Sequence, residues 1–249
     1  MNTRSPVEVH FVGTGDAVGS GGRFQACTLI ATPSSSIVVD CGATTMTALR
    51  LHGLDPAPVT TLLITHLHGD HFGGVPFFLL DAVFSKRSSP LTIAGPRGLR
   101  DVLDAALGAF YPGTNLADLP FPVTVRELLP REASLFDGIR VTAFPVSHFE
   151  GTEPHALRVE CSNRVIAFSG DTGWVPSLVD VSREADLFIC EAYHLDRASP
   201  MHLDYATLTA NRHLLTCKRI VVTHLAADLL SRLPHLEREA PSDGAQISI

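Results

Sequence analysis

A run of metal-binding residue types directly after an apolar strand constrains what this chain can fold into. The β-branched segment 60–65 leads into the sequence HLHGDH, in which four of the six residues carry an imidazole or a carboxylate. His66 and His68 are two apart on an extended backbone and therefore project to the same side. The glycine that follows permits a sharp turn, so Asp70 and His71 can face the same point from the start of a helix. This set of side chains is typical of a site for a divalent metal ion and excludes a cysteine-type zinc site.

The same arrangement recurs at the ends of other predicted strands. Three apolar segments each end just before a histidine or an aspartate: 140–146 before His148, 164–169 before Asp171, and 219–223 before His224. If these strands are neighbours in a sheet, the side chains line one edge, where functional sites are usually built. The resulting set of histidines and aspartates is sufficient for two metal ions that share a carboxylate.

Hydrophobic periodicity predicts more strands than helices. Besides the strands already named and an alternating segment at 7–11, we expect strands at 27–32, 36–40, 91–94, 156–161 and 186–190. Helices are expected at 44–52, 73–85, 97–110, 203–215 and 226–239, the last of which contains Pro234. The helices fall between runs of strands, which favours sheets covered by helices over a doubly wound array. No linker divides residues 1–240, so we expect a single domain followed by a loosely ordered tail at 241–249.

The composition indicates the cellular compartment of the protein and the classes of partner that it can bind. The chain has 249 residues, of which 45% are hydrophobic, which is enough for a large core. The net charge is −7, and the few basic residues are scattered, which argues against a nucleic-acid-binding surface. The five cysteines are odd in number and widely spaced, as in a reducing compartment. We see no signal peptide in residues 1–6 and no membrane-spanning segment, so we expect a cytoplasmic protein without membrane contact.

The ordered set of ligand residues resembles the metallo-β-lactamase superfamily over nearly the whole chain. The resemblance extends from the Gly13-Thr14-Gly15 loop to His224. It implies an α/β fold of the αββα sandwich type, with two facing mixed β-sheets and helices on the outer faces. It also implies two Zn²⁺ ions, with Mn²⁺ or Fe²⁺ as alternatives. Carried over by position, the ligands are His66, His68 and His148 for one ion and Asp70, His71 and His224 for the other, with Asp171 bridging both.

Within this superfamily the chain is similar to ribonuclease Z and related phosphodiesterases. The similarity lies in residues 11–15, residues 90–96 and a Glu-Ala pair that begins at Glu191. It implies that His202 protonates the leaving group, and Glu191 is a candidate to orient that histidine. The chain departs from the family in two places. A cysteine stands before Glu191 where the family has histidine, and nothing between 98 and 140 resembles the arm that grips transfer RNA.

The resemblance implies a dinuclear metal-dependent hydrolase. We expect a phosphodiesterase in which a hydroxide that bridges the metals is the nucleophile and Asp70 orients it or accepts its proton. The alternative is a lactonase, thioesterase or carboxylesterase of the same fold, and a non-catalytic binding module is a third hypothesis. The expected substrate is small and anionic or ester-like, extended RNA is not expected to bind, and a homodimer is expected from similar proteins. We also expect the loop 13–23 to line the entrance, with Arg23 facing an anionic group.

Several residues allow simpler interpretations. His155 competes with His148 as the third ligand of the first ion, although His148 follows its strand more directly. Asp171 could cap the turn that follows it, and His202 could be a structural residue at the start of a helix. Glu191 and Asp40, each at the end of a strand, fit a role in orienting a site histidine and also ordinary buried hydrogen bonding.

Overall fold

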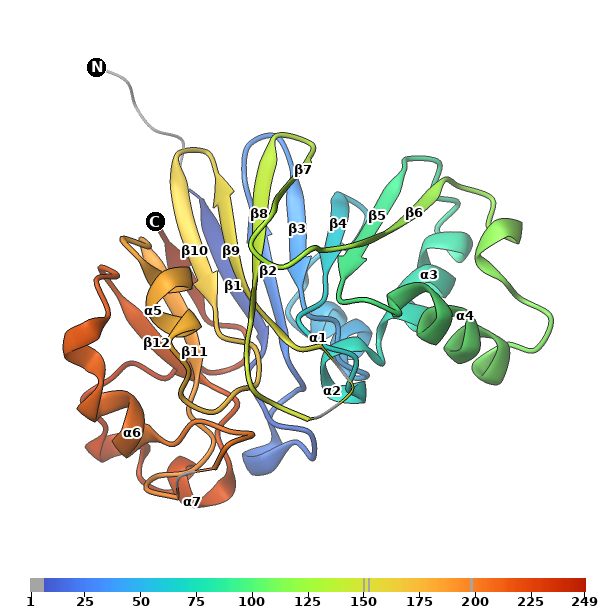
Figure 1. Ribbon diagram of the computed structural model, residues 1–249. Coiled ribbons are helices and arrows are strands. Elements are labelled where there is room, and N and C mark those ends of the chain that lie inside the picture. Colours follow the sequence, from blue (N-terminus) through green and yellow to red (C-terminus); the bar gives the residue numbers. More distant parts are fainter. Residues whose placement is uncertain (1–6, 150, 152, 198) are drawn as a thin grey trace.

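The computed structural model describes residues 7–149, 151, 153–197 and 199–249 and shows two β-sheets packed face to face (Figure 1). The first six residues, on which the expectation about a signal peptide depends, lie outside the described residues. Within the described part of the chain, both sheets contain parallel and antiparallel pairs of strands. The sheets are therefore mixed, as predicted.

The first sheet is built mainly from the N-terminal half of the chain. Its strands, in spatial order, are β13 (Gln246–Ser248), β1 (Glu8–Gly13), β2 (Cys27–Ala31), β3 (Ser36–Val39), β4 (Val59–Leu63), β5 (Leu91–Gly95) and β6 (Val123–Glu127). The strands from β3 to β6 run parallel to one another, so their carboxyl ends meet at one edge. The HLHGDH run begins three residues after β4, at that edge.

The second sheet is built from the C-terminal half. Its spatial order is β12 (Ile220–Thr223), β11 (Leu187–Glu191), β10 (Arg164–Phe168), β9 (His155–Cys161), β8 (Ile139–Pro145) and β7 (Ala133–Phe136). The strands β10, β11 and β12 are parallel. Asp171, Glu191 and His224 therefore lie at, or just after, the carboxyl ends of three adjacent strands.

Neighbouring residues of the central strands pack into different apolar layers. Ile37 of β3 and Leu63 of β4 are buried between the two sheets, together with residues of the second sheet such as Ile189. The adjacent Val38 and Leu62 instead pack toward the helices. Since side chains alternate between the two faces of a strand, each sheet here is apolar on both faces and needs cover on both sides.

Helices supply the outer cover of each sheet (Figure 1). The first sheet packs against α1 (Thr45–Leu51), α3 (Val75–Phe84) and α4 (Leu99–Phe110). The second packs against α5 (Ser177–Ser182), α6 (Tyr205–Ala210) and α7 (Ala227–Leu230). The short helix α2 (Gly69–Phe72) carries Asp70 and His71. The predicted αββα class is confirmed.

Some predicted elements differ from the structure. The helix expected at 203–215 is the shorter α6 followed by a 3₁₀ turn, Arg212–Leu214, and β-branched threonines in this segment favour helix weakly. The helix expected at 226–239 is α7 followed by a 3₁₀ turn, Leu233–His235, because Pro234 cannot continue an α-helix. The edge strands β6 and β7 were not predicted, because both are short and most of their residues are at least partly exposed, which leaves a weak apolar pattern.

The expectation of a loosely ordered tail is wrong. Residues 246–248 form β13, which pairs in antiparallel fashion with β1. Upstream of it, the Asp243 carboxylate accepts hydrogen bonds from the backbone and the hydroxyl of Thr14, at 2.8 and 2.7 Å, and from the backbone N–H of Phe24, at 2.6 Å. These pairings join residues from opposite ends of the chain, so no local sequence pattern predicts them.

Two further observations concern the described residues as a set. None of their helices combines the length and the apolar character needed to span a bilayer. Cys27, Cys41, Cys161, Cys190 and Cys217 are all buried as free thiols. Burial raises the pKa of the Cys190 and Cys161 thiols, the latter to about 11, so these two residues behave as small apolar core residues.

Candidate metal centre

Backbone hydrogen bonds hold the turn after β4 on two sides and so fix the positions of the candidate ligands that it carries. The N–H of Ile64 donates to the carbonyl of Ala94 at 2.8 Å, which extends the pairing with the next strand beyond the end of β4. His68 keeps an extended backbone and serves as the N-cap residue of α2. The carbonyl of His71 accepts a hydrogen bond from the N–H of Cys41 at 2.6 Å, which attaches α2 to the segment after β3.

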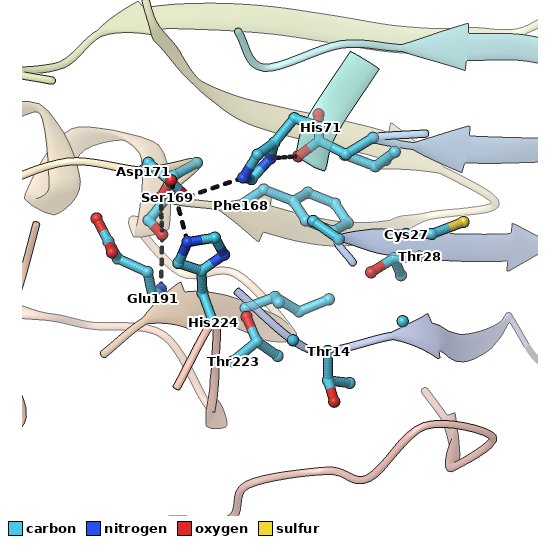
Figure 2. A pocket seen from close by; sticks show the side chains of 17 residues that line it. Thr14, Cys27, Thr28, His71, Phe168, Ser169, Asp171, Glu191, Thr223 and His224 are labelled. Atoms are coloured by element: carbon cyan, nitrogen blue, oxygen red, sulfur yellow. Dashed lines mark hydrogen bonds and ion pairs between the residues drawn. The ribbon is translucent and has the colours of Figure 1, made fainter. Parts of the chain in front are cut away.

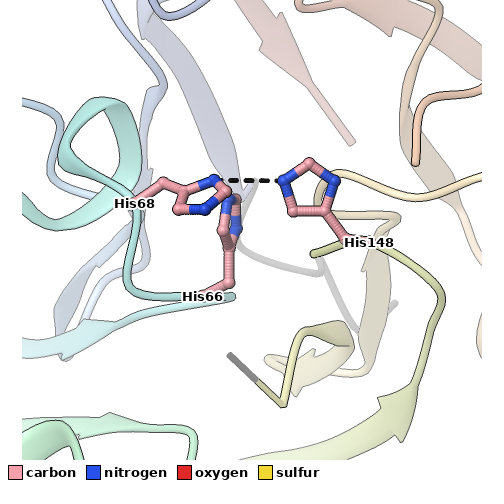
Figure 3. Close-up of side chains that lie close together, drawn as sticks. All are labelled: His66, His68 and His148. Atoms are coloured by element: carbon pink, nitrogen blue, oxygen red, sulfur yellow. Dashed lines mark hydrogen bonds between the residues drawn. The ribbon is translucent and has the colours of Figure 1, made fainter. Parts of the chain in front are cut away.

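His66, His68 and His148 form the first ligand group. One ring nitrogen from each lies within 4.8 Å of the others, and Figure 3 shows the rings of His68 and His148 facing each other beside His66. His148 Nε2 is 3.1 Å from His68 Nδ1. On its far side, His148 Nδ1 donates to the Met201 carbonyl at 2.7 Å, which leaves Nε2 as the nitrogen free to bind a metal.

Asp70, His71, Asp171 and His224 form the second ligand group, and all four are buried. Figure 2 shows His71, from α2, and His224, which follows β12, both converging on Asp171. The Nε2 atom of His71 lies 3.1 Å from Asp171 Oδ1, and that of His224 lies 3.2 Å from Asp171 Oδ2. Asp70 Oδ2 is 3.4 Å from His71 Nε2. The sequence-predicted residues of the second ion are thus brought together.

Asp171 lies between the two groups. Its Oδ2 atom is 3.9 Å from the Nε2 atoms of both His66 and His148, in addition to its contact with His224. The expected bridging position is therefore available to this carboxylate. His155, the alternative to His148, is buried in β9, and its backbone N–H donates to the Thr65 carbonyl at 2.9 Å. It is in neither ligand group.

The donor atoms of these groups are better suited to binding divalent ions than to forming hydrogen bonds with one another. Among the described residues, His66 Nε2, His71 Nε2 and Asp171 Oδ1 are buried and have no hydrogen-bond partner. Buried polar atoms normally have partners, so three unpaired ones within the two ligand groups indicate that a ligand completes them. Imidazole nitrogens with carboxylate oxygens are the donor set of zinc and related first-row ions.

Burial and neighbouring charges shift the pKa values of His66, Asp171 and Asp70 toward the forms that coordinate metals. At His71, burial acts to lower the pKa, but the negative charge of Asp171 outweighs it and raises the pKa well above its ordinary value. Burial, reinforced by the nearby His71, holds the pKa of His66 well below its ordinary value, so this imidazole is neutral. For Asp171, burial opposes ionisation, but the positive charges of His224 and His71 outweigh it and lower the pKa. Burial likewise opposes ionisation of Asp70, yet the nearby imidazole of His71, whose Nε2 lies 3.4 Å from Asp70 Oδ2, lowers the pKa overall. Neutral imidazoles and ionised carboxylates are the forms that coordinate metals.

Glu191 and His202 lie beside the ligand groups. Oε2 of Glu191 is 3.0 Å from Nδ1 of His202, and the same ring nitrogen is 3.9 Å from Asp171 Oδ2. The other oxygen of Glu191 accepts a hydrogen bond from the backbone N–H of Thr172. Burial raises the pKa of Glu191, and the negative charge of Asp171 adds to this effect. Burial lowers the pKa of His202, an effect that the charge of Asp171 opposes.

Tyr193 completes the wall at this side of the centre. Its ring stacks on His202 with a centroid separation of 4.5 Å and an interplanar angle of 30°. From the sequence alone, Tyr193 could border the pocket, but packing in the core is the default expectation for an aromatic residue. Its position two residues after Glu191, which places both on the same side of an extended backbone, is the signal that could have identified it.

One sequence-based expectation about the entrance is wrong. Arg23 does not present Nη1 to an incoming anion, because that nitrogen donates to the Thr14 hydroxyl and to the Pro241 carbonyl, both at 2.7 Å. Arg23 is therefore a structural residue that ties the loop to the C-terminal segment. Ala17, from the same loop, does line the mouth of the metal centre.

Comparison with known proteins places this geometry in a family. The family model described as "Anti-Pycsar protein Apyc1" matches residues 7–233. The chain belongs to this family. The Apyc1 model thus includes every residue that we assign to the two ligand groups.

Individual relatives and solved structures agree with the resemblance described above. A ribonuclease Z from Methanothermobacter thermautotrophicus is 34% identical over 142 residues, which are 57% of this chain and 45% of that protein. The short form of human tRNase Z has a TM-score of 0.78 at 28% identity and covers 97% of this chain and 99% of its own. A metallo-β-lactamase fold protein from Bacillus subtilis, YhfI, has a TM-score of 0.75 at 19% identity, with 98% and 100% covered.

These findings confirm the predicted superfamily and the ribonuclease Z-like subgroup. They also support the prediction of a metal-dependent hydrolase. The chain nonetheless spans less than half the length of the Methanothermobacter relative. The activity and substrates of that whole protein can therefore only be proposed for this chain.

Proposed function

We propose that this chain is a dinuclear metal-dependent phosphodiesterase. The position of Asp171 carries the proposal, because this one carboxylate lies within 4 Å of His66, His71, His148, His202 and His224. It therefore joins two potential ligand groups to the Glu191–His202 pair. Ribonuclease Z among the relatives supports the same reaction class, since its name denotes cleavage of a phosphodiester.

The metal ligands we propose are His66, His68 and His148 for one ion and Asp70, His71 and His224 for the other, with Asp171 shared. We propose zinc, because the set is rich in imidazole. When bound, a pair of divalent ions polarises a phosphoryl oxygen and lowers the pKa of water at the site. Asp70 directs one oxygen toward His71 and His224, and we assign its other oxygen to orienting the attacking water.

His202 is the residue we assign to protonation of the leaving group. Its Nδ1 is held by Glu191, so Nε2 is the nitrogen that can meet a departing oxygen. His202 lines the same mouth as Asp70, Asp171 and His224, which supports a position beside a phosphoryl group bound there. Transfer of a proton from this nitrogen neutralises the alkoxide as the bond to phosphorus breaks.

A small anionic diester is the substrate class that we propose. The mouth of the centre has a volume of about 220 Å³, and the net charge of the chain is −7, which does not favour a long polyanion. The segment 98–140, which lacks the sequence features of an RNA-gripping arm, folds largely as α4, a 3₁₀ turn, β6 and β7. A homodimer and a cytoplasmic location remain predictions from the sequence.

The test is metal analysis coupled to a substrate panel. Purified protein is expected to contain about two equivalents of zinc and to hydrolyse bis(4-nitrophenyl) phosphate faster than a lactone or a thioester. Asp70→Ala is expected to lose metal from the second ligand group and to lower phosphodiester turnover by at least a hundredfold, about the scale of losing a catalytic metal function.

The matched control is Asp81→Ala, which removes an aspartate that pairs with Arg50, belongs to neither ligand group and does not line the mouth. This variant is expected to keep both metal content and turnover. Preferential cleavage of the lactone or thioester would replace the phosphodiesterase proposal with the alternative hydrolase. Protein that binds no zinc, manganese or iron would contradict both.

A further inference from the structure

A second cavity lies directly beside the mouth of the metal centre. Its volume is about 370 Å³, within the range of small-molecule sites. It is bounded by the segment after β8, the turn after Asp171 and the segment before α6. Its walls include Ser147, Trp174, Val175, Pro200, Leu203 and Thr207.

His202 forms the partition between the cavity and the metal centre. It lines both the 370 Å³ cavity and the mouth that contains Asp70 and Asp171. Its imidazole is 3.9 Å from Asp171 and is held by Glu191 at 3.0 Å. A substituent on a phosphoryl group at the metal centre can therefore extend past the imidazole into the cavity.

The walls of the cavity are connected by hydrogen bonds. Ser147 Oγ donates to the Pro200 carbonyl at 3.0 Å, and the N–H of Gly173 donates to the Ser147 carbonyl at 2.9 Å. A Cβ atom at Gly173 would lie 2.6 Å from the same Pro200 carbonyl, so the backbone here packs as closely as glycine allows. The cavity is thus preformed, which reduces the entropy that a bound group would otherwise lose in ordering it.

The wall side chains select an uncharged group. Asp204 is buried, and its carboxylate accepts hydrogen bonds from the N–H and the hydroxyl of Thr207, both at 2.8 Å. The Ser147 hydroxyl is also already paired. The wall also includes the half-buried indole of Trp174, the single tryptophan of the chain. A planar aromatic group can stack on this indole without displacing any of these hydrogen bonds.

We propose that this cavity is a subsite for an uncharged aromatic substituent of the phosphodiester, on the leaving-group side, with Trp174 as the residue that determines specificity. The proposal rests on the proposed function, because the metal centre must hold the phosphoryl group. It defines the substrate class as small aryl or heteroaryl phosphodiesters.

Two phosphonates with the same headgroup test the subsite. Phenylphosphonate and methylphosphonate are titrated into zinc-loaded wild-type protein, and both tryptophan emission and inhibition of bis(4-nitrophenyl) phosphate hydrolysis are followed. Phenylphosphonate is expected to bind about tenfold more tightly, the scale of one aromatic pair plus its buried area. It should also change the emission of Trp174, whereas methylphosphonate should compete and leave the emission nearly constant.

Two substitutions of aromatic residues test whether the preference for phenylphosphonate depends on Trp174. Trp174→Leu is expected to weaken inhibition by phenylphosphonate about tenfold and to leave inhibition by methylphosphonate unchanged. Phe149→Ala removes an aromatic ring that lies 5.9 Å from the His68 ring, outside the cavity, and should keep the preference for phenylphosphonate. Equal affinity for the two phosphonates with constant emission would overturn the subsite and leave the phosphodiesterase proposal intact. Loss of the preference in Phe149→Ala alone would also overturn it.

Failure of the proposed function has a different signature. Wild-type protein without phosphodiester turnover would contradict the phosphodiesterase proposal, and the emission titration would still test whether Trp174 meets a phenyl group.

Discussion

One buried carboxylate, that of Asp40, is shared between the end of β4 and a histidine of the metal centre. Its Oδ2 atom is 2.8 Å from Nδ1 of His71, and its Oδ1 atom accepts the backbone N–H of Thr65 at 2.8 Å. Asp40 has a φ of 59°, in the left-handed region that non-glycine residues seldom adopt. The backbone is thus strained at the residue that orients His71, and strain of this kind is common at functional sites.

Asp40→Asn is expected to weaken metal binding by about ten- to a hundredfold, because it removes the negative charge that fixes the ring and raises its basicity. Competition with a chromophoric chelator measures the affinity directly. Asp81→Asn, at the surface pair with Arg50, serves as the control and should bind metal like the wild type. An unchanged zinc affinity in Asp40→Asn would show that the hydrogen bond to His71 does not tune the centre.

His202→Ala is expected to slow hydrolysis most where the leaving group most needs a proton. Turnover of diphenyl phosphate should fall by about a hundredfold or more, whereas bis(4-nitrophenyl) phosphate, which releases a better leaving group, should lose less. Comparison of kcat for the two substrates measures this difference. His213→Ala, an exposed histidine, is the control. Equal losses for both substrates, or no loss, would contradict the assignment of His202 as the acid.

Asp243→Ala is expected to lower the free energy of unfolding by about 2–3 kcal/mol, because three hydrogen bonds to Thr14 and Phe24 are lost. Urea unfolding followed by circular dichroism gives this value. Ser242→Ala, an exposed neighbour whose carbonyl alone is bonded, should change stability little. If the two variants are equally stable, the C-terminal segment does not stabilise the fold through Asp243.

Asp186 makes stability depend on pH. Burial acts to raise its pKa, but hydrogen bonds from Lys218 and from the backbone N–H of Val165 outweigh burial and lower the pKa below the ordinary 3.8. A lowered pKa in the folded state means that the stabilisation is complete above pH 3.8 and is lost as the pH falls through the folded-state value.

Asp186→Asn should therefore cost about 1 kcal/mol near neutral pH, and the difference from wild type should shrink in acid. Urea unfolding at several pH values measures this trend. Asp180→Asn, which removes a more exposed partner of Arg131 and Arg183, should cost less at every pH. A cost for Asp186→Asn that is the same in acid as at neutral pH would contradict the linkage.

That the proposed ligand side chains meet in two candidate ligand groups could be predicted, because each depends on a local pattern. Every proposed ligand lies just after an apolar strand, and both the strand and the residue type are visible in the sequence. The choice of His148 over His155 could be argued only weakly, because both lie near the β8–β9 connection. The structure distinguishes them by burying His155 in a strand and directing His148 toward His68.

What the sequence determined by itself was most of the strands, the chemistry gathered at their ends and the class of fold. The tertiary structure alone decided that Tyr193 stacks on His202, that Arg23 is tied to Pro241, and that residues 246–248 pair with β1. The physical reason is the range of the interactions. Side-chain alternation and turn preferences act between near neighbours in the chain, whereas these contacts depend on which strands become adjacent once both sheets are packed.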